Sequence, residues 1–467
     1  MTYRRGTAII VISIGLALLV GAVAWQWPTI RHAAISVSPD DRPNIVLIVS
    51  DDQRYDTMNA MPSLVKFMEQ GTTFSSAYTT TPLCCPARAS ILTGLYAHNH
   101  GVLGNRPPYG FPAFDDSSTI ATWLHDSGYQ TALIGKYLND YNTDDAKYLP
   151  KGWDVFRSFL DKPGYDEFTL TNFVDEQWVE TKTYNKSDGE YSTHLLTDFT
   201  REFIDDSTSS AQPFFLMFTP YAPHSPATPP TEYRRGTDTF PDVASYNEAD
   251  VSDKTEWVNV LPELSTIEQN SIDRAQRNVY GSLRALDDDI QKLIETLRAS
   301  GELDNTVIIY IGDNGVHWGE HRIADGKTTP YEESIHVPLL MYDGRSPSSG
   351  TDERLVLNID LAPTIADIAN VTATSSMDGR SIFSTEPWRE EFLTECWGGE
   401  DAPPFTSLHR NDMVFIQYEG DQQELYDLSK DPYQLQNLVN DPTHQAVVEE
   451  MNATLKNIEK CQGNSCP

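Results

Sequence analysis

Four short apolar runs recur along the chain, and polar or ionisable residues follow each of them. The runs are continuous and rich in β-branched side chains, which is typical of strands buried on both faces of a sheet. They cover residues 44–50, 130–134, 214–218 and 306–311. The polar residues that follow them include Asp51 and Asp52, Lys136, His224, and Asp313 and Asn314. The pattern therefore predicts four buried strands with chemically useful side chains at their carboxyl ends.

Helical periodicity lies between these runs. It is clearest in residues 279–300, where Leu286, Ile290, Leu293 and Leu297 repeat at helical spacing and Gly301 follows as a stop. Strands that alternate with helices predict an α/β fold with a doubly wound, mostly parallel sheet. In such sheets ligands bind beyond the carboxyl ends of the strands, so we expect the active site there.

The pattern changes in three places along the chain. Residues 139–190 and 225–268 are rich in proline and polar residues, and we expect loops that shape a substrate pocket. After about residue 370 the alternation fades, and 413–418 with 424–428 predict antiparallel strands before a helix at about 443–460. We therefore expect a catalytic α/β domain at 43–370 and a smaller α+β subdomain at 371–467.

The N-terminus carries a targeting segment within residues 1–42. Arg4 and Arg5 precede an uncharged apolar run at residues 8–25, and a polar linker follows it. The run is long for the core of a signal peptide and just long enough to span a membrane. Ala22-Val23-Ala24 could serve as a cleavage site, so a cleaved signal peptide and a membrane tether both stay open. In either case the rest of the chain is exported.

Composition narrows the function classes. The 467 residues are 39% hydrophobic, which excludes a disordered protein, and 34 Lys and Arg against 68 Asp and Glu give a net charge of −34. That charge excludes a nucleic-acid binder held by phosphate contacts. It also repels sulfated or phosphorylated substrates, unless cations are concentrated locally. Five cysteines are too few for a disulfide scaffold, although Cys461 and Cys466 are close enough to close a small loop.

Two polar pairs at strand ends suggest a metal site. Asp51 and Asp52 follow one predicted strand, and Asp313 and Asn314 follow another. Three carboxylates packed together repel one another, and a hard divalent cation with oxygen ligands relieves that repulsion. The alternative is that these residues only cap helices and turns, which is the better interpretation for either pair alone.

Residues 83–94 predict a helix with a reactive side chain at its start. Pro86 suits the first turn of a helix, and Gly94 is a suitable end. Cys84 then lies at the N-terminus, where the helix dipole favours negative charge, with Arg88 one turn further on. This arrangement predicts an anion site, and the alternative is a pair of buried cysteines before an ordinary helix.

The run Cys84-Cys85-Pro86-Ala87-Arg88 resembles the C-x-P-x-R signature of the type I sulfatases, with Ala87 in place of the more usual Ser. Further similar motifs follow in the family's order at residues 42–52, 135–139, 223–226, 313–315, 326–332 and 424–432. The resemblance covers residues 42–437 and is closest to the N-acetylglucosamine-6-sulfatases. It implies an alkaline-phosphatase-like fold and hydrolysis of a sulfate ester, of either a sulfated sugar or an aryl sulfate.

The resemblance also implies a set of site residues. In this family the signature cysteine, here Cys84, is oxidised to formylglycine by a generating enzyme, and its hydrate attacks sulfur. The implied ligands of Ca²⁺, with Mg²⁺ as the second choice, are Asp51, Asp52, Asp313, Asn314 and the modified Cys84. The other implied roles are that Arg88 holds the hydrate, that Lys136 and Lys327 bind sulfate, and that His224 with Lys327 protonates the departing oxygen. A chain end or a small sulfate ester then suits the acidic chain better than a long polymer.

One position departs from the family. Many sulfatases have a histidine two residues after the lysine that corresponds to Lys136, where this chain has Leu138. That histidine is usually assigned as the base that releases sulfate. We expect its role to pass to another side chain, with His317, also expected to bind substrate, and His98 as the candidates.

Two other functions compete with the sulfatase hypothesis. The first is a phosphonate or phosphate ester hydrolase of the alkaline phosphatase superfamily, which would favour extra His and Asp ligands for a second metal; the sequence does not offer that set. The second is an unmodified, non-catalytic binding protein of the cell surface. Intact Cys84, Arg88 and metal-ligand positions argue against it, because a decayed site would lose some of them.

Overall fold

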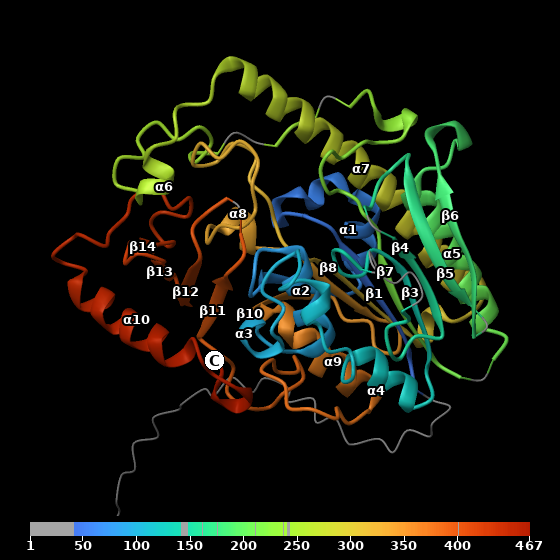
Figure 1. Cartoon of the computed structure of the whole chain (residues 1–467). Helices are drawn as coiled ribbons and strands as arrows, with labels where there is room; N and C mark the ends of the chain where they lie inside the picture. Colours follow the sequence, from blue (N-terminus) through green and yellow to red (C-terminus); the bar gives the residue numbers. More distant parts are fainter. Residues whose placement is uncertain are drawn as a thin grey trace, which may run out of the picture. The chain divides into compact units, whose positions relative to one another are not determined.

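The buried runs lie next to one another in one sheet of ten strands. The computed structural model describes residues 42–467 except 142–147, 161, 175, 211, 237, 241–242 and 400. Within the described residues the strand order is β10-β2-β9-β8-β1-β7-β3-β4-β5-β6 (Figure 1). The bounds are β1 Asn44–Ser50, β2 Thr72–Tyr78, β3 Gln130–Gly135, β4 Val155–Phe159, β5 Phe168–Val174, β6 Gln177–Tyr184, β7 Phe214–Thr219, β8 Thr306–Gly312, β9 Leu339–Asp343 and β10 Gly350–Leu357.

The centre of this sheet is parallel, as the alternation of strands and helices predicts. Every neighbouring pair in the run β8-β1-β7-β3-β4 is parallel, whereas β9 and the strands β5 and β6 pair antiparallel. Parallel neighbours bring their carboxyl ends to the same edge, so the residues that follow β1, β3, β7 and β8 converge there.

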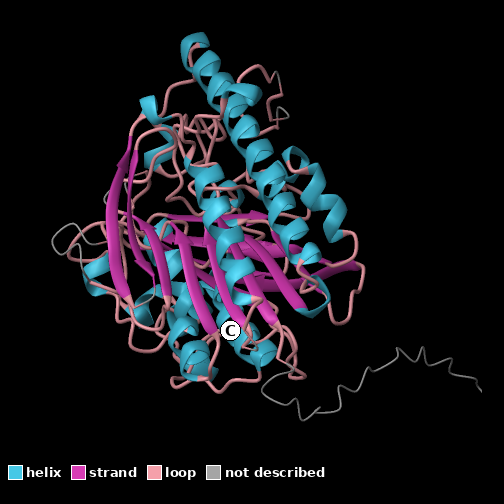
Figure 2. Cartoon of the chain, turned by 90° about the vertical axis from the view of Figure 1, so that its right-hand side faces the viewer, coloured by secondary structure: helices cyan, strands magenta, loops and turns pink. Residues whose placement is uncertain are grey.

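Helices cover both faces of the sheet (Figure 2). Ile45, Leu47 and Val49 of β1 pack on one face with α2, α4 and α9, and Val46 and Ile48 pack on the other with α1, α5 and α7. This is why the run is apolar at every position. The bounds are α1 Pro62–Met68, α2 Cys84–Thr93, α3 Ala97–His100, α4 Ile120–Asp126, α5 Ser192–Ser207, α6 Glu256–Asn259, α7 Thr266–Ala299, α8 Glu332–Ile335 and α9 Leu361–Ala369.

Two expectations from the pattern need correction. The segment 139–190 is not all loop, since it contains β4, β5 and β6. The outermost strand β6 is mostly exposed, so it lacks the apolar alternation that marks a strand with one buried face. Helix α7 also begins well before residue 279. It starts at Thr266, after a capping box formed by Ser265 and Glu268.

A second sheet lies in the C-terminal part of the chain. Its four antiparallel strands are β11 Glu391–Cys396, β12 Phe405–Arg410, β13 Met413–Tyr418 and β14 Gln423–Asp427, and α10 Gln445–Ile458 packs on them. This confirms the predicted antiparallel strands β13 and β14 and the helix after them. Cys461 and Cys466 form a disulfide. The domain boundary between 370 and 371 stays a prediction.

The predicted targeting segment, including the apolar run at 8–25, lies outside the described residues. Across the part of the chain that the structure describes, no helix combines the length and the apolar character needed to cross a membrane.

Candidate active site

The carboxyl ends of β1 and β8 place two acidic segments against each other. Ser50 pairs with Gly312 in the parallel register, so Asp51 and Asp52 leave one strand where Asp313 and Asn314 leave the next. Asp313 Oδ1 accepts hydrogen bonds from the main-chain N–H groups of Asp52 (2.9 Å) and Asn314 (2.8 Å). Asn314 Nδ2 donates to Asp52 Oδ1 at 2.7 Å. The predicted convergence of these four residues is thus observed.

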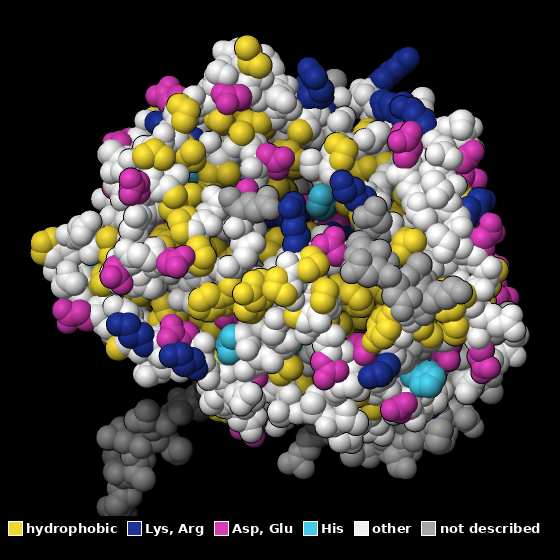
Figure 3. Space-filling view, viewed as in Figure 1, with side chains coloured by type: hydrophobic (Ala, Val, Ile, Leu, Met, Phe, Trp, Pro, Cys, Tyr) yellow, Lys and Arg dark blue, Asp and Glu magenta, His cyan; other side chains and the backbone are white. Residues whose placement is uncertain are grey.

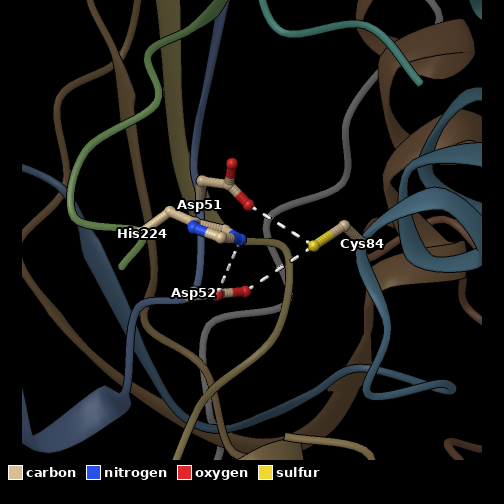
Figure 4. A group of neighbouring side chains, drawn as sticks. All are labelled: Asp51, Asp52, Cys84 and His224. Carbon is tan, nitrogen blue, oxygen red and sulfur yellow. Dashed lines mark hydrogen bonds and ion pairs between the residues drawn. The ribbon is translucent and has the colours of Figure 1, made fainter. Parts of the chain in front are cut away.

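Cys84 faces these carboxylates from the first turn of α2 (Figure 4). Its Sγ lies 3.5 Å from Asp51 Oδ1 and 3.7 Å from Asp52 Oδ1, and Lys327 Nζ donates to it at 2.8 Å. Helix α2 ends at Gly94 in the left-handed conformation, as predicted. Burial raises the pKa of the Cys84 thiol to about 12, and neither Lys136 nor Lys327 offsets this effect. Burial therefore disfavours the thiolate form of Cys84.

One side of Cys84, which we call the buried half, consists of Asp51, Arg88, Lys136 and Asp313. Lys136 Nζ donates to both oxygens of Asp51, at 2.9 and 2.7 Å, and the side chains are 3% and 0% exposed. Arg88 Nε donates to Asp313 Oδ2 at 2.8 Å. Burial alone would raise the pKa of Asp51, but Lys136, His224 and Arg88 outweigh it and hold the pKa at about 2. These charges form a closed network beneath the sulfur.

Lys136 reaches this place because a glycine precedes it. Gly135 has φ +126°, and a Cβ added there would lie 2.0 Å from the carbonyl oxygen of Thr219 on the neighbouring strand β7. The N–H of Lys136 donates to that same oxygen at 2.7 Å. The close approach of β3 and β7 therefore requires glycine, and it fixes the start of the Lys136 side chain.

The other side of Cys84, the open half, consists of Asp52, His224 and Lys327. Lys327 Nζ donates to both oxygens of Asp52, at 2.7 and 2.9 Å, and its side chain is 16% exposed. His224 Nε2 lies 3.3 Å from Asp52 Oδ2, and its Nδ1 lies 2.6 Å from the carbonyl oxygen of Ser225. The ring of Tyr221 stacks on the histidine ring. This half faces solvent and leaves a histidine edge and an ammonium group next to the sulfur.

The residues present fit a metal ion. One ligand atom each of Asp51, Asp52, Cys84 and His224 lies within 4.8 Å of the others. Asn314 Oδ1 is buried and accepts no hydrogen bond, so this oxygen is available as a ligand for a metal ion. Carboxylate and amide oxygens are ligands that hard divalent cations prefer. Both oxygens of Asp313 accept hydrogen bonds from the protein, as do both oxygens of Asp51 and of Asp52, so the role of Asp313 as a ligand stays a prediction.

The histidines proposed as a substitute base lie elsewhere. The ring of His317 is fully buried and hydrogen-bonds Thr329 Oγ1 at 2.7 Å, while its main-chain N–H donates to Gly326 beside Lys327. His98 contacts Glu395 and the carbonyl oxygen of Cys461. The hydrogen bonds described for these two rings are thus made with groups other than Cys84, and His317 supports the Lys327 loop through its main chain. Leu138 is buried.

Sequence reasoning missed Asp401, which holds the Lys327 loop. Its Oδ2 accepts hydrogen bonds from the main-chain N–H groups of Lys327 (3.0 Å) and Thr328 (3.2 Å) and from Thr328 Oγ1 (3.0 Å). Asp401 follows β11 in an irregular segment, 74 residues from Lys327. No periodicity or motif marks that segment, so no signal in the sequence could have found it.

Comparisons with known proteins identify the family of the chain. The chain matches the family model described as sulfatase over residues 43–371, and the one described as N-sulphoglucosamine sulphohydrolase, C-terminal, over residues 319–461. It is 32% identical to an N-acetylglucosamine-6-sulfatase of Capra hircus, over 91% of this chain and 85% of that protein. A Caenorhabditis elegans homologue of the extracellular sulfatase Sulf-1 is also 32% identical, over 76% of this chain, which spans 53% of that longer protein.

Solved structures share the fold. A protein in complex with its substrate, D-glucosamine-2-N,6-O-disulfate, superposes with a TM-score of 0.74 at 23% identity, over 90% of this chain and 98% of that one. A phosphonate monoester hydrolase of Agrobacterium radiobacter gives a TM-score of 0.71 at 21% identity, over 89% and 95% of the two chains. At such identities the likeness shows the fold, and it confirms the expected architecture.

Proposed function

The chain belongs to the sulfatase family and is a sulfuric ester hydrolase, and from this premise we propose that it removes sulfate from the 6-position of glucosamine-type sugars. The N-acetylglucosamine-6-sulfatase of Capra hircus supports this substrate class through its similarity over most of both chains. The solved relative that binds a 6-O-sulfated glucosamine supports it through the shared fold. Simple aryl sulfates are the convenient alternative substrates.

The position of Cys84 carries this proposal. Its sulfur lies at the carboxyl edge of the sheet, between Asp51 and Asp52, and accepts a hydrogen bond from Lys327. The high pKa of the buried thiol makes the unmodified side chain a poor nucleophile, because the thiolate is the reactive form. Conversion of Cys84 to formylglycine by a generating enzyme removes this obstacle, which supports its assignment as the modified residue.

The family chemistry needs two additions to the chain. The formylglycine hydrate supplies a hydroxyl nucleophile, and a divalent cation, in our proposal Ca²⁺, supplies positive charge next to the sulfate oxygens. Asp51, Asp52, Asp313 and Asn314 would hold the cation, and Asn314 Oδ1 is available for it because this oxygen accepts no hydrogen bond from the protein. Asp313 would also orient the group, because it accepts hydrogen bonds from the main-chain N–H groups of Asp52 and Asn314.

The cationic side chains then have separate roles. Lys136 and Arg88 keep the buried half charged and fixed, and Lys136 with Lys327 provides positive charge for the sulfate. His224 Nδ1 lies 2.6 Å from the Ser225 carbonyl oxygen and Nε2 lies 3.3 Å from Asp52 Oδ2, so these two contacts fix the orientation of the ring. The proton at Nε2, with Lys327 beside it, is the one we assign to the departing sugar oxygen.

Export from the cytoplasm belongs to the same proposal. The similarity to extracellular sulfatases supports it, and so does the Cys461–Cys466 disulfide, since disulfides persist in oxidising compartments. The N-terminal run at 8–25 would then be a cleaved signal or a tether.

The test combines mass spectrometry with turnover. Protein co-expressed with a formylglycine-generating enzyme is digested, and the peptide containing Cys84 to Arg88 is weighed. The expected result is the mass change from thiol to aldehyde, together with sulfate release from N-acetylglucosamine-6-sulfate that Cys84→Ala abolishes. Faster turnover of a matched phosphate ester would instead favour the phosphonate or phosphate ester hydrolase. An unmodified Cys84 without turnover would favour the surface binding protein.

A further inference from the structure

His224 stands on a loop, although the proposed reaction needs its Nε2 atom in a fixed place. The residue follows β7 in the segment 220–227, which contains no helix or strand. A general acid transfers its proton only within hydrogen-bond distance of the reacting oxygen, and small misplacements slow the reaction strongly. The His224 side chain is 24% exposed, and Figure 3 shows Lys, Arg and His side chains around the hollow near the centre of this face. Its orientation therefore has to come from neighbouring groups.

Tyr221 contacts both the histidine ring and the hydrogen-bond partner of that ring. The two rings stack with centroids 4.7 Å apart and planes inclined by 24°. The hydroxyl of Tyr221 donates to the Ser225 carbonyl oxygen at 2.9 Å, and His224 Nδ1 lies 2.6 Å from the same oxygen. Because a carbonyl oxygen can only accept, this contact favours the hydrogen on Nδ1 and leaves Nε2 to exchange a proton. Tyr221 thus fixes the plane of the ring and the oxygen that sets its rotation.

A second tyrosine and the main chain hold the loop in place. The hydroxyl of Tyr165 donates to the His224 carbonyl oxygen at 2.8 Å, and its ring centroid lies 5.1 Å from that of Tyr221. The N–H of His224 donates to the Tyr221 carbonyl oxygen at 3.0 Å. The N–H of Asp51 donates to the Ala222 carbonyl oxygen at 3.2 Å. The loop that carries His224 is therefore tied directly to the acidic segment after β1.

Both tyrosines are buried, so water does not compete for their hydrogen bonds. Tyr221 is 7% exposed and Tyr165 is 4% exposed. Burial raises the pKa of each phenol well above its ordinary value, so both hydroxyl groups stay protonated and remain donors. Each hydroxyl donates to a main-chain carbonyl oxygen of the His224 loop. This arrangement suits groups that position another side chain and do not themselves give a proton to a substrate.

We propose that Tyr221 is the positioning residue of His224, and that its ring and hydroxyl together aim Nε2 at the departing oxygen of the substrate. Tyr165 supports this role through the main chain. The inference rests on the proposed function, because it takes His224 as the proton donor. In that step the hydroxyl nucleophile bonds to sulfur, the bond from sulfur to the sugar oxygen breaks, and this oxygen keeps the electron pair and takes the Nε2 proton. The cost of misplacing His224 therefore grows with the need of the departing oxygen for a proton.

Substrates with graded leaving groups separate positioning from a purely structural role. A nitrophenolate leaves readily without a proton, a phenolate less readily, and a sugar alkoxide needs the proton most. Wild type and Tyr221→Leu, both co-expressed with a formylglycine-generating enzyme, are assayed with 4-nitrophenyl sulfate, phenyl sulfate and N-acetylglucosamine-6-sulfate. For Tyr221→Leu we expect kcat to fall by about tenfold or more with the sugar sulfate and by less than about threefold with 4-nitrophenyl sulfate, while KM stays nearly constant.

Two further variants complete this test. Tyr221→Phe keeps the stacked ring and loses the hydrogen bond to Ser225, so it should show the same trend with a loss of about threefold for the sugar sulfate. Tyr280→Leu is the matched control, because Tyr280 is a buried tyrosine of the same apolar core whose hydroxyl donates to Asn59 Oδ1. The control should show no dependence on the leaving group. Losses in both Tyr221 variants that are equal for all three substrates, or no loss at all, would overturn the proposal.

Nuclear magnetic resonance of the histidine rings gives a readout that does not need turnover. Protein with isotope-labelled histidine is compared before and after substitution, and His224→Gln identifies the signals of His224. We expect one set of ring signals with the hydrogen on Nδ1 in the wild type and in Tyr280→Leu, and shifted or broadened signals in Tyr221→Leu. Unchanged signals in that variant would overturn the positioning role. Turnover of none of the substrates, together with the expected change in the signals, would overturn the proposed function but support the positioning of His224.

Discussion

The two halves of the site use the same chemical pair, a lysine on an aspartate, in different surroundings. Lys136 and Asp51 in the buried half are 3% and 0% exposed, while Lys327 and Asp52 in the open half are 16% and 7% exposed. The buried pair has its geometry fixed by the sheet, because Lys136 follows Gly135 directly at the end of β3. The open pair depends on a loop held by Asp401. The buried pair can therefore stabilise the fold in addition to its proposed role towards the sulfate, whereas the open pair contributes mainly to the reaction.

The largest expected effect tests the open half. Lys327→Met should lower kcat by about 10²- to 10⁴-fold, because the ammonium group beside Cys84 and His224 is lost. The loss of stability should be smaller than that for Lys136→Met, because Asp52 is 7% exposed and keeps His224 next to it. Steady-state kinetics and thermal unfolding measure the two quantities. Lys430→Met, at a lysine that is 77% exposed, is the matched control. An unchanged kcat would remove Lys327 from the reaction.

The same substitution in the buried half should act on stability. Lys136→Met leaves Asp51 buried without its nearest partner, which costs about 3–5 kcal/mol. Denaturant unfolding of this variant beside Lys327→Met compares the halves directly. Equal losses of stability in the two variants would contradict the larger contribution of the buried half to stability.

A smaller effect tests the support of the open half. Asp401→Ala removes the acceptor of three hydrogen bonds at Lys327 and Thr328. We expect kcat to fall by about tenfold and KM to stay nearly constant. A tenfold fall corresponds to the net free energy of one or two hydrogen bonds. Asp401→Asn keeps one carbonyl acceptor and should recover most of the rate. A loss that Asn does not rescue would point to the charge of Asp401 and not to its hydrogen bonds.

The smallest effect concerns a histidine outside both halves. Burial would lower the pKa of His98, but hydrogen bonding to Glu395 and its charge raise it above the ordinary value. The protonated ring therefore stabilises the fold fully below the unfolded-state pKa of about 6.5, and this contribution is lost as pH rises through the higher folded-state pKa. His98→Gln should reduce the fall in Tm between pH 6 and pH 9 by about 1 °C. A pH profile identical to that of the wild type would show that the pair does not stabilise the fold.

The central strands could be predicted because both of their faces are buried, so almost every position in a run such as 44–50 has an apolar side chain. The strands at the sheet margins could not. β6 is largely exposed, and β2 pairs with strands more than 260 residues away, so its place depends on contacts that no local pattern contains.

The site divides in the same way. Asp51, Asp52, Asp313 and Asn314 follow buried strands, and the parallel register alone brings them together. Lys327 lies in a loop and entered through the family resemblance, since a lysine without periodic neighbours carries no signal of its own. Asp401 does not directly follow a predicted strand and belongs to no recognised motif. The position of a side chain on a loop depends on tertiary contacts, and these contacts are known only from the structure.

The burial of Cys84 has a consequence for timing. Its side chain is 0% exposed, and Lys327, which contacts its sulfur, lies 243 residues further along the chain. A modifying enzyme cannot reach a side chain that the finished fold encloses. Since synthesis proceeds from the N-terminus, Cys84 emerges long before the loop that covers it can form. Under the proposed function, conversion of Cys84 to formylglycine must therefore precede the folding of that loop, and conditions that speed folding should leave more of the protein unmodified.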